Sequence, residues 1–192
     1  RSTVTHSNAD PVSPGASVSG ETVTDVYGNL ISYRDISGTS TSYVYNDDRE
    51  QIGFTMKDAA GSVILNVRVK ADDLGRESKI TVNGKEVASV AYQSTTGLAD
   101  TITYPGGVEL KYRYDARKSP DKLTITGPND ASIVHTQSKN DIGRIMGSTI
   151  NIDGPVTFKE DRAYEYNNDN RLTRTVIATN GKEQRFRYAF LR

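Results

Sequence analysis

Cysteine and tryptophan are absent from this 192-residue chain, and histidine occurs only twice. Without cysteine there is no disulfide, no thiolate metal site and no cysteine nucleophile. His6 lies in a serine-rich N-terminal stretch, and His135 lies in an alternating run typical of a strand. The motifs Gly-x-Ser-x-Gly and His-Glu-x-x-His do not occur either. We therefore expect no catalytic residue, no metal ligand and no cofactor.

An excess of one charge is also lacking, because 24 basic residues balance 24 acidic ones. A nucleic-acid-binding protein usually shows a clustered basic excess, so we expect no nucleic-acid partner. The tail Arg185-Phe186-Arg187-Tyr188 interleaves bases with aromatic rings, which we interpret as a final amphipathic strand. No apolar run is long enough to span a bilayer. A hydrophobic content of 35% and a mean hydropathy of −0.58 suit a thin sheet better than a thick core.

What the chain does contain is internal repetition, which decides architecture before single residues can be interpreted. Three copies of one phrase stand out, and fainter copies lie between and after them. The clear copies are Tyr43-Val44-Tyr45-Asn46-Asp47, Tyr112-Arg113-Tyr114-Asp115-Ala116 and Tyr164-Glu165-Tyr166-Asn167-Asn168. The second aromatic or apolar position recurs in steps of 22 to 28 residues. These anchor positions are Tyr45, Val69, Tyr92, Tyr114, Ser138, Tyr166 and Tyr188.

Each unit is predicted to be a strand, a polar turn, a second strand and a glycine turn. Val108–Tyr114 alternates apolar and charged residues, which indicates a strand with one buried and one wet face. Asn83-Gly84 and Asn180-Gly181 separate alternating runs, and this dipeptide tolerates the positive φ angles of a tight hairpin turn. Asp153-Gly154 and Gly106-Gly107 are weaker signals of the same kind. The glycines that follow the first six anchors are Gly61, Gly84, Gly106, Gly127, Gly154 and Gly181.

A recurring Tyr-x-Tyr-Asp, followed by a polar turn with Gly-Arg-Leu, resembles the RHS/YD-repeat family. The phrases that carry this resemblance are Tyr112-Arg113-Tyr114-Asp115, Asp73-Leu74-Gly75-Arg76, Asp141-Ile142-Gly143-Arg144 and Tyr164-Glu165-Tyr166-Asn167 with Asn170-Arg171-Leu172. Val67-Arg68-Val69-Lys70 and Gln137-Ser138-Lys139 depart from the pattern by lacking both tyrosines. The resemblance implies large secreted or surface proteins whose hairpins lie side by side in a spiralling sheet. In some members that sheet forms a shell around a toxic C-terminal domain.

The fold expected is all-β, an antiparallel sheet of repeated hairpins that forms a curled sheet or a partly closed barrel or sandwich. Residues 1–21 are rich in Ser, Thr, Pro, Gly and Ala and are predicted to be a flexible leader or linker. Residues 22–192 are predicted to hold about seven repeat units.

An open stack of hairpins exposes unpaired backbone at both edges. Barrel closure, capping by the leader and pairing with another copy, a partner or further units of a longer chain all remain open.

Three hypotheses on function follow. The first is a non-catalytic structural or interaction module of a secreted or cell-surface protein, from a toxin-delivery or adhesion system, with a protein partner or adjoining segments of a longer chain. The second is a carbohydrate- or small-ligand-binding sheet, since tyrosines lie beside Arg, Asn and Asp. The third, an enzyme, depends on paired carboxylates such as Asp47-Asp48 and Asp72-Asp73, which fall at predicted turns where aspartate usually binds the local backbone. The oxygen-rich stretches 45–48 and 167–170 lack the spacing of a calcium loop. We favour the first hypothesis, with binding residues unknown.

Overall fold

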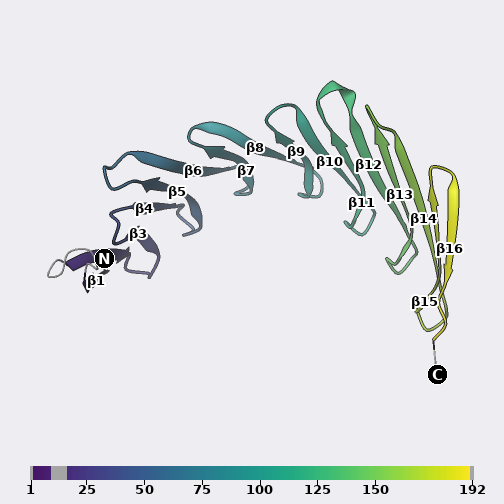
Figure 1. Cartoon of the computed structure of the whole chain (residues 1–192), viewed down its shortest axis with the longest axis horizontal. Helices are drawn as coiled ribbons and strands as arrows, with labels where there is room; N and C mark the ends of the chain where they lie inside the picture. Colours follow the sequence, from purple (N-terminus) through teal and green to yellow (C-terminus); the bar gives the residue numbers. More distant parts are fainter. Residues whose placement is uncertain (1, 10–16, 191–192) are drawn as a thin grey trace. The chain divides into compact units, whose positions relative to one another are not determined.

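The computed structural model describes residues 2–9 and 17–190 as an all-β protein built from sequential antiparallel hairpins (Figure 1). Its contacts divide it into two compact units, Arg1–Ser89 and Val90–Arg192. Each unit is described here by itself. The predicted fold class, an antiparallel sheet of repeated hairpins, is confirmed.

In the first unit each strand pairs with the next one along the chain. Its strands are β1 (Ser2–Ala9), β2 (Ser17–Thr24), β3 (Leu30–Arg34), β4 (Ser40–Tyr45), β5 (Gln51–Lys57), β6 (Val63–Ala71), β7 (Glu77–Val82) and the first part of β8 (Lys85–Tyr92). Of the predicted leader, residues 1 and 10–16 lie outside the described residues. The described remainder of that segment forms β1 and the beginning of β2, which pair from Ser2↔Thr24 to Ala9↔Ser17.

The second unit continues the same topology, with every neighbouring pair from β9 to β16 antiparallel. Its strands are β9 (Ala99–Tyr104), β10 (Val108–Tyr114), β11 (Pro120–Thr126), β12 (Ser132–Lys139), β13 (Ile145–Asp153), β14 (Phe158–Tyr166), β15 (Leu172–Thr179) and β16 (Lys182–Arg187). A 3-10 turn, η1 (Pro128–Asp130), lies between β11 and β12. Among the described residues neither unit pairs its first strand with its last, so neither closes into the barrel that was one of the expected alternatives.

Alternation along the strands separates an apolar face from a polar face in each unit. In the second unit, directly paired residues form an apolar row that crosses six strands: Ile102, Leu110, Ile125, Ile133, Ile152 and Phe158. The adjacent row of paired residues lies one position away, at i+1 in one strand and i−1 in the next, because neighbouring strands are antiparallel. It is made up of Thr101, Lys111, Thr124, Val134, Asn151 and Lys159. Paired residues share a face of the sheet and successive residues alternate between faces, so the first row belongs to the apolar face and the second to the polar face.

The first unit repeats this separation with the row Tyr43, Phe54, Val67 and Val82 on one face. Little of the apolar face is sealed from water, as a single sheet has no second layer to cover it. Among residues with described side chains, only Val23 and Ala88 are buried apolar residues, at 2% and 9% exposure. The low hydrophobic content of the sequence therefore matches a sheet one layer thick.

Candidate functional site

Eight five-residue loops in the described chain share one hydrogen-bonded geometry, and we call them the Asx loops. The first residue is Asp or Asn, and its side-chain oxygen accepts the backbone N–H of the fifth residue over 2.8 to 3.0 Å. Its own backbone N–H donates to the carbonyl of the fifth residue, and its carbonyl accepts the N–H of the fourth. The loops begin at Asp25, Asp35, Asn46, Asp58, Asp72, Asp115, Asn140 and Asn167.

The fourth residue of every Asx loop has a positive φ angle, between 61° and 91°. Five of these residues are glycine, and the others are Arg49, Lys118 and Asn170. A type I turn followed by a left-handed residue is the usual three-residue hairpin connection with a bulge. The pairing register shifts beside seven of the eight loops, all but the one that begins at Asp35, and such a shift is what a bulge produces. The Asx loops therefore fix both the turn and the register of the hairpins that they connect.

The second tyrosine of each Tyr-x-Tyr phrase fastens two neighbouring strands at their ends. The hydroxyls of Tyr45, Tyr114 and Tyr166 each donate to a backbone carbonyl, at 2.9, 2.8 and 3.0 Å. Each acceptor is the first residue of the preceding strand: Leu30, Ala99 and Ile145. Burial raises the pKa of Tyr114, with smaller contributions from Tyr112 and Asp100, so this hydroxyl stays a proton donor across the physiological range. The repeated tyrosine is thus a structural clamp.

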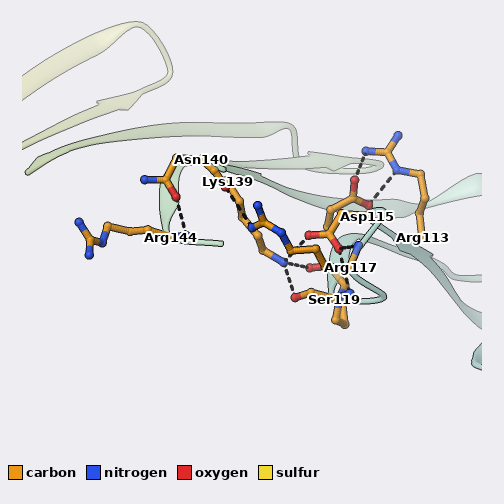
Figure 2. A network of polar contacts seen from close by, with 9 residues as sticks. Arg113, Asp115, Arg117, Ser119, Lys139, Asn140 and Arg144 are labelled. Atoms are coloured by element: carbon orange, nitrogen blue, oxygen red, sulfur yellow. Dashed lines mark hydrogen bonds and ion pairs between the residues drawn. The ribbon is translucent and has the colours of Figure 1, made fainter. Parts of the chain in front are cut away.

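In the second unit three Asx loops, 115–119, 140–144 and 167–171, lie at one end of the sheet, and we call them the loop row. Long cations bind one loop to the next (Figure 2). Arg117 donates through Nη1 to the carbonyl of Asn140 at 3.2 Å, and Arg144 donates through Nη1 to Oδ1 of Asn170 at 2.6 Å. The Arg144 guanidinium also lies 4.6 Å from the centre of the Tyr166 ring, within the range of a cation–π contact.

Lys139 makes the densest of these connections. Its Nζ lies 2.5 Å from Oγ of Ser119, 2.8 Å from the carbonyl of Pro120 and 3.4 Å from Oδ2 of Asp115. Its side chain is 12% exposed, so little of the ammonium group remains for a ligand. The N–H of Ser119 holds the pKa of Asp115 below its ordinary value, and Arg117 and Lys139 add to this effect while partial burial opposes it. Three acceptors match the three ammonium protons of Lys139, which suits a structural cross-link.

The two Asn-Gly turns are located where the sequence predicts them, between β7 and β8 and between β15 and β16. Asn83, Gly84, Asn180 and Gly181 have φ angles of 50°, 76°, 47° and 81°, as the predicted primed turns require. Each asparagine also binds the strand before its own hairpin. Oδ1 of Asn83 accepts the N–H of Asn66 at 2.7 Å, and Oδ1 of Asn180 accepts the N–H of Lys159 at 2.9 Å.

Of the weaker turn signals, Gly106 and Gly107 have φ angles of 83° and 79°. Gly154 has a φ of 155°, and the Cβ that any other residue would carry there comes within 3.3 Å of Cβ of Ala131. The predicted glycine turn at Gly127 differs, because its φ is −106° and its backbone is extended. The 3-10 turn of residues 128–130 reverses the chain there instead, with Asn129 and Asp130 in the left-handed region.

The six tyrosines that carry the repeat lie two apart on β4, β10 and β14, so each pair points to one face of its unit. The rings of Tyr112 and Tyr114 are stacked with centres 6.4 Å apart, and the ring of Tyr43 lies 6.5 Å from that of Phe54. The complete set is Tyr43, Tyr45, Tyr112, Tyr114, Tyr164 and Tyr166. His135 is half-buried on β12, paired with Leu123 and Ile150 in the apolar face.

Of the carboxylates considered for catalysis, Asp72 is engaged in its own turn. Asp72 accepts the N–H groups of Leu74 and Arg76 and forms an ion pair with Arg76 at 2.5 Å. This interaction with the Arg76 side chain lowers the pKa of Asp72. Of the two oxygen-rich stretches, Asn46 and Asn167 use their side-chain oxygens on the backbone of their own loops. Within the described chain no group of three or more acidic or histidine side chains is placed to hold a metal ion.

Two hollows in the second unit differ in chemistry. One of about 420 Å³ is lined mainly by apolar residues, including Ile125, Ile133, Ile152 and Val156. The other, of about 400 Å³, borders the loop row and is lined by Asp115, Arg117, Asp121, Gln137, Lys139, Asn140 and their neighbours. Within it Asp121 is held by Arg113 through two bonds of 2.9 and 3.1 Å. The described part of the chain contains no helix long and apolar enough to span a membrane.

Sequence reasoning missed the Asx loop as a unit, although its signal is present. The repeat pattern places Asp73 and Asp141 at the start of the polar turns, whereas the residues whose side chains bind the loop backbone are Asp72 and Asn140, one position earlier. The spacing between these residues and the glycines would have revealed the loops. In every Asx loop the Asp or Asn that binds the backbone stands three positions before the residue with a positive φ angle, which is most often glycine. The links made by Lys139, Arg117 and Arg144 connect different loops and have no comparable sequence signal.

No protein-family model matches this chain, and no characterised protein matches it in sequence. Solved structures do match its fold. The crystal structure of TcdB2–TccC3–Cdc42 aligns with a TM-score of 0.66 and 11% identity, over 96% of this chain and 11% of that one. The Photorhabdus luminescens Tc holotoxin pore, carrying the mutation TccC3-D651A, aligns with a TM-score of 0.64 and 13% identity, over 88% of this chain and 9% of that one. The chain thus spans about a tenth of the length of these neighbours, and the likeness is one of fold.

Proposed function

We propose that this chain is a non-catalytic structural segment of a secreted or cell-surface YD-repeat protein that belongs to a toxin-delivery system. The observation that carries the proposal is the repeated hairpin closed by an Asx loop and a tyrosine clamp, as seen for Tyr114 and Asp115. Two further findings support it. The Tyr-x-Tyr-Asp phrases resemble the RHS/YD family, and the fold resembles chains of Tc toxin structures.

The hydrogen bonds of the polar side chains in the Asx loops also favour a structural role. The aspartates of the loops accept backbone N–H groups, and Lys139 donates to two oxygens of the neighbouring loop and to the carbonyl of Pro120, which follows that loop. A catalytic site needs groups that stay free to meet a substrate. The partners that suit this arrangement are adjoining segments of a longer chain or a protein that contacts the sheet.

The proposal is tested on the complete polypeptide that carries this chain, secreted from its own host. A variant lacking residues 115–139 joins Tyr114 directly to the next Asx loop and so removes two whole strands with their turns. A matched control lacking residues 127–139 removes one strand, β12, with the η1 turn before it, and so reverses the chain direction of every later strand. We expect the whole-unit deletion to remain secreted and protease-resistant, and the one-strand deletion to be degraded. Equal degradation of both, or turnover of a substrate that either deletion abolishes, would contradict a structural segment.

Carbohydrate binding is the second candidate, and the polar hollow beside the loop row is the observation in its favour. Its carboxylate, amide and cationic side chains could hydrogen-bond a polyhydroxylated ligand. The tyrosines argue against a sugar platform, since the hydroxyls of Tyr45, Tyr114 and Tyr166 are committed to backbone carbonyls. A glycan array probed with the purified chain tests this role, and loss of any hit in Gln137→Ala would place the sugar in the hollow.

A further inference from the structure

The apolar hollow of about 420 Å³ lies at the end of the second unit opposite the loop row. Strands β11, β12 and β13 supply its central row, in which Ile125 pairs with Ile133 and Ile133 pairs with Ile152. Val156, from the turn between β13 and β14, also lines it. Val156 is 73% exposed and Ile133 is 39% exposed, so the hollow is open to water. Large apolar side chains exposed together in this way mark a site of interaction.

The turns that border the hollow carry the smallest side chains. Gly154 has a φ of 155°, and a Cβ there would come within 3.3 Å of the Cβ of Ala131. A Cβ on Gly127 would lie 3.9 Å from the same atom. All three residues line the hollow, and their small size leaves its volume to a group from outside the chain.

Carboxylates surround this hollow. Asp153 is one of its lining residues, Glu109 follows the lining residue Val108, and Asp130 precedes the lining residue Ala131. All three carboxylates belong to exposed residues, and within the described chain none of them forms an ion pair. They are therefore available to a cation that approaches the hollow.

Two lysines lie nearby on the polar face of the sheet. Lys159 of β14 is bound to Asp161 at 3.1 Å. Lys111 of β10 stands two residues after Glu109, and it can offset only one of the three carboxylates. Because the sheet is one layer thick, charges on its polar face act at the hollow within a Debye length of about 10 Å. The net charge around the hollow is therefore negative.

We propose that the hollow binds a segment of a partner protein in which a large apolar side chain is flanked by lysine or arginine. The apolar group packs over Ile133 and Val156, and the cation lies beside Asp153. Burial of the apolar group supplies affinity, and the carboxylates select a basic segment over an acidic one. This inference rests on the proposed function, because it names the chemistry of a protein that contacts the sheet.

The geometry favours a chain segment over the other possible occupants. Pockets for small molecules bury most of the ligand, whereas this hollow is open and its apolar row continues to Leu110 on one side and Phe158 on the other. A second copy of the chain is disfavoured by charge. A two-fold contact sets one patch against itself, which would bring Glu109, Asp130 and Asp153 towards their own counterparts.

The experiment uses the purified chain and a fluorescent, end-capped peptide, Gly-Lys-Leu-Phe-Lys-Gly. One control peptide replaces both lysines with glutamine, a second replaces both with glutamate, and a third replaces Leu-Phe with Ser-Ser. Anisotropy gives the dissociation constants at about 0.05 M and about 0.5 M salt, which changes the range of the electrostatic attraction. Methyl NMR reports whether the peptide contacts Ile133, Ile152 and Val156.

We expect the lysine peptide to bind about threefold to tenfold more tightly than the glutamine peptide at low salt, the range that exposed ion pairs supply. The glutamate peptide should bind more weakly than either. The advantage of lysine should shrink at high salt, because the carboxylates are then screened. Loss of the apolar pair in the serine peptide should weaken binding by at least about tenfold.

Variants of the chain test the two parts of the site separately. Val156→Ser should weaken the lysine peptide about fivefold without unfolding the chain, since this side chain is 73% exposed. Combining Glu109→Gln, Asp130→Asn and Asp153→Asn should abolish the preference for lysine over glutamine. A matched control makes the same change of charge at three exposed aspartates that do not line the hollow, and it should keep the preference. These aspartates are Asp73, Asp141 and Asp169.

Equal affinities for the lysine, glutamine and glutamate peptides, or methyl shifts elsewhere in the chain, would overturn the inference. Self-association of the free chain that Val156→Ser abolishes would assign the hollow to a second copy instead. The same methyl shifts with indole alone, at equal concentration, would assign it to a small apolar ligand and overturn the inference as well. Peptide binding is measured on the purified chain and secretion on the complete polypeptide, so the two proposals can fail separately.

Discussion

The hydroxyl of Tyr114 donates to the backbone carbonyl of Ala99 over 2.8 Å, which joins the end of β10 to the beginning of β9 across 15 positions of sequence. Tyr112, two residues earlier on the same strand, stacks on Tyr114 without such a bond to a described residue. The two tyrosines of one phrase therefore have different tasks. One adds ring contact on the apolar face, and the other closes the hairpin at its open end.

We expect Tyr114→Phe to lower the free energy of unfolding by about 1 kcal/mol, because the Ala99 carbonyl loses its donor while the ring is kept. Tyr112→Phe is the matched control and should change stability by only a few tenths of that amount. Urea unfolding followed by circular dichroism measures both. Equal losses in the two variants would mean that the hydroxyl bond is not what stabilises the hairpin.

The Asn-Gly turn at residues 83–84 gives a test of backbone strain alone. A Cβ on Gly84 would meet no atom within 4 Å, so a substitution there causes no clash, but its φ is 76°. Gly84→Val should therefore cost about 1 to 2 kcal/mol through the left-handed backbone. Gly127→Val, at a φ of −106°, is the control and should cost clearly less. An unchanged melting temperature for Gly84→Val would contradict the turn.

Lys118 occupies the fourth position of its Asx loop with a φ of 61°, where five of the eight loops have glycine. Lys118→Gly should raise the free energy of unfolding by about 0.5 to 1 kcal/mol, because relief of left-handed strain exceeds the entropy that glycine adds to the unfolded chain. Ala116→Gly, in the same loop without a positive φ, should be destabilising. Thermal melts of both variants give the two signs, and a destabilised Lys118→Gly would argue against strain at this position.

Lys139 is expected to couple the loops 115–119 and 140–144. Lys139→Met keeps the apolar stem but removes the charge from Ser119, Pro120 and Asp115, so it should cost about 1 to 2 kcal/mol. The exposed Lys111→Met on β10 is the control and should be nearly neutral. Hydrogen exchange should show faster opening of residues 115–119 in the Lys139 variant. If only residues 140–144 open faster, the cross-link does not hold the earlier loop.

Aspartates at the start of Asx loops should make stability fall in acid. The hydroxyl of Ser37, aided by the N–H groups of Ser37 and Thr39, lowers the pKa of Asp35 below its ordinary value of 3.8. Since the folded pKa is the lower one, this contribution is complete above pH 3.8 and is lost as the pH falls through the folded pKa. Asp35→Asn keeps the loop, as Asn46 does in its own, but lacks this contribution, so it should be less stable than the parent near neutral pH, and the difference should shrink as the pH falls. Urea midpoints measured from pH 7 down to pH 2.5 provide the comparison, and parallel curves for both proteins would contradict it.

Much of the fold could be predicted from residues that act locally. Alternation in Val108–Tyr114 predicted a strand that the structure reproduces as β10, and Asn83-Gly84 and Asn180-Gly181 predicted hairpin turns with positive φ angles. Gly127 shows the limit of this reasoning, because the turn depends on residues 128–130 and not on the glycine. The partners of Lys139 and Arg144 could not be predicted, since they come from neighbouring loops about 20 and 26 residues away.

The sequence by itself determined the strands, their turns and the repeated phrase, because pleating, turn geometry and left-handed backbone depend on residues close together in the chain. Only the tertiary structure decided that the second tyrosine of each phrase clamps a carbonyl, that Asp and Asn close the loops, and that Arg117, Lys139 and Arg144 join one loop to the next. Those contacts depend on register between strands, and register sets which distant side chains become neighbours.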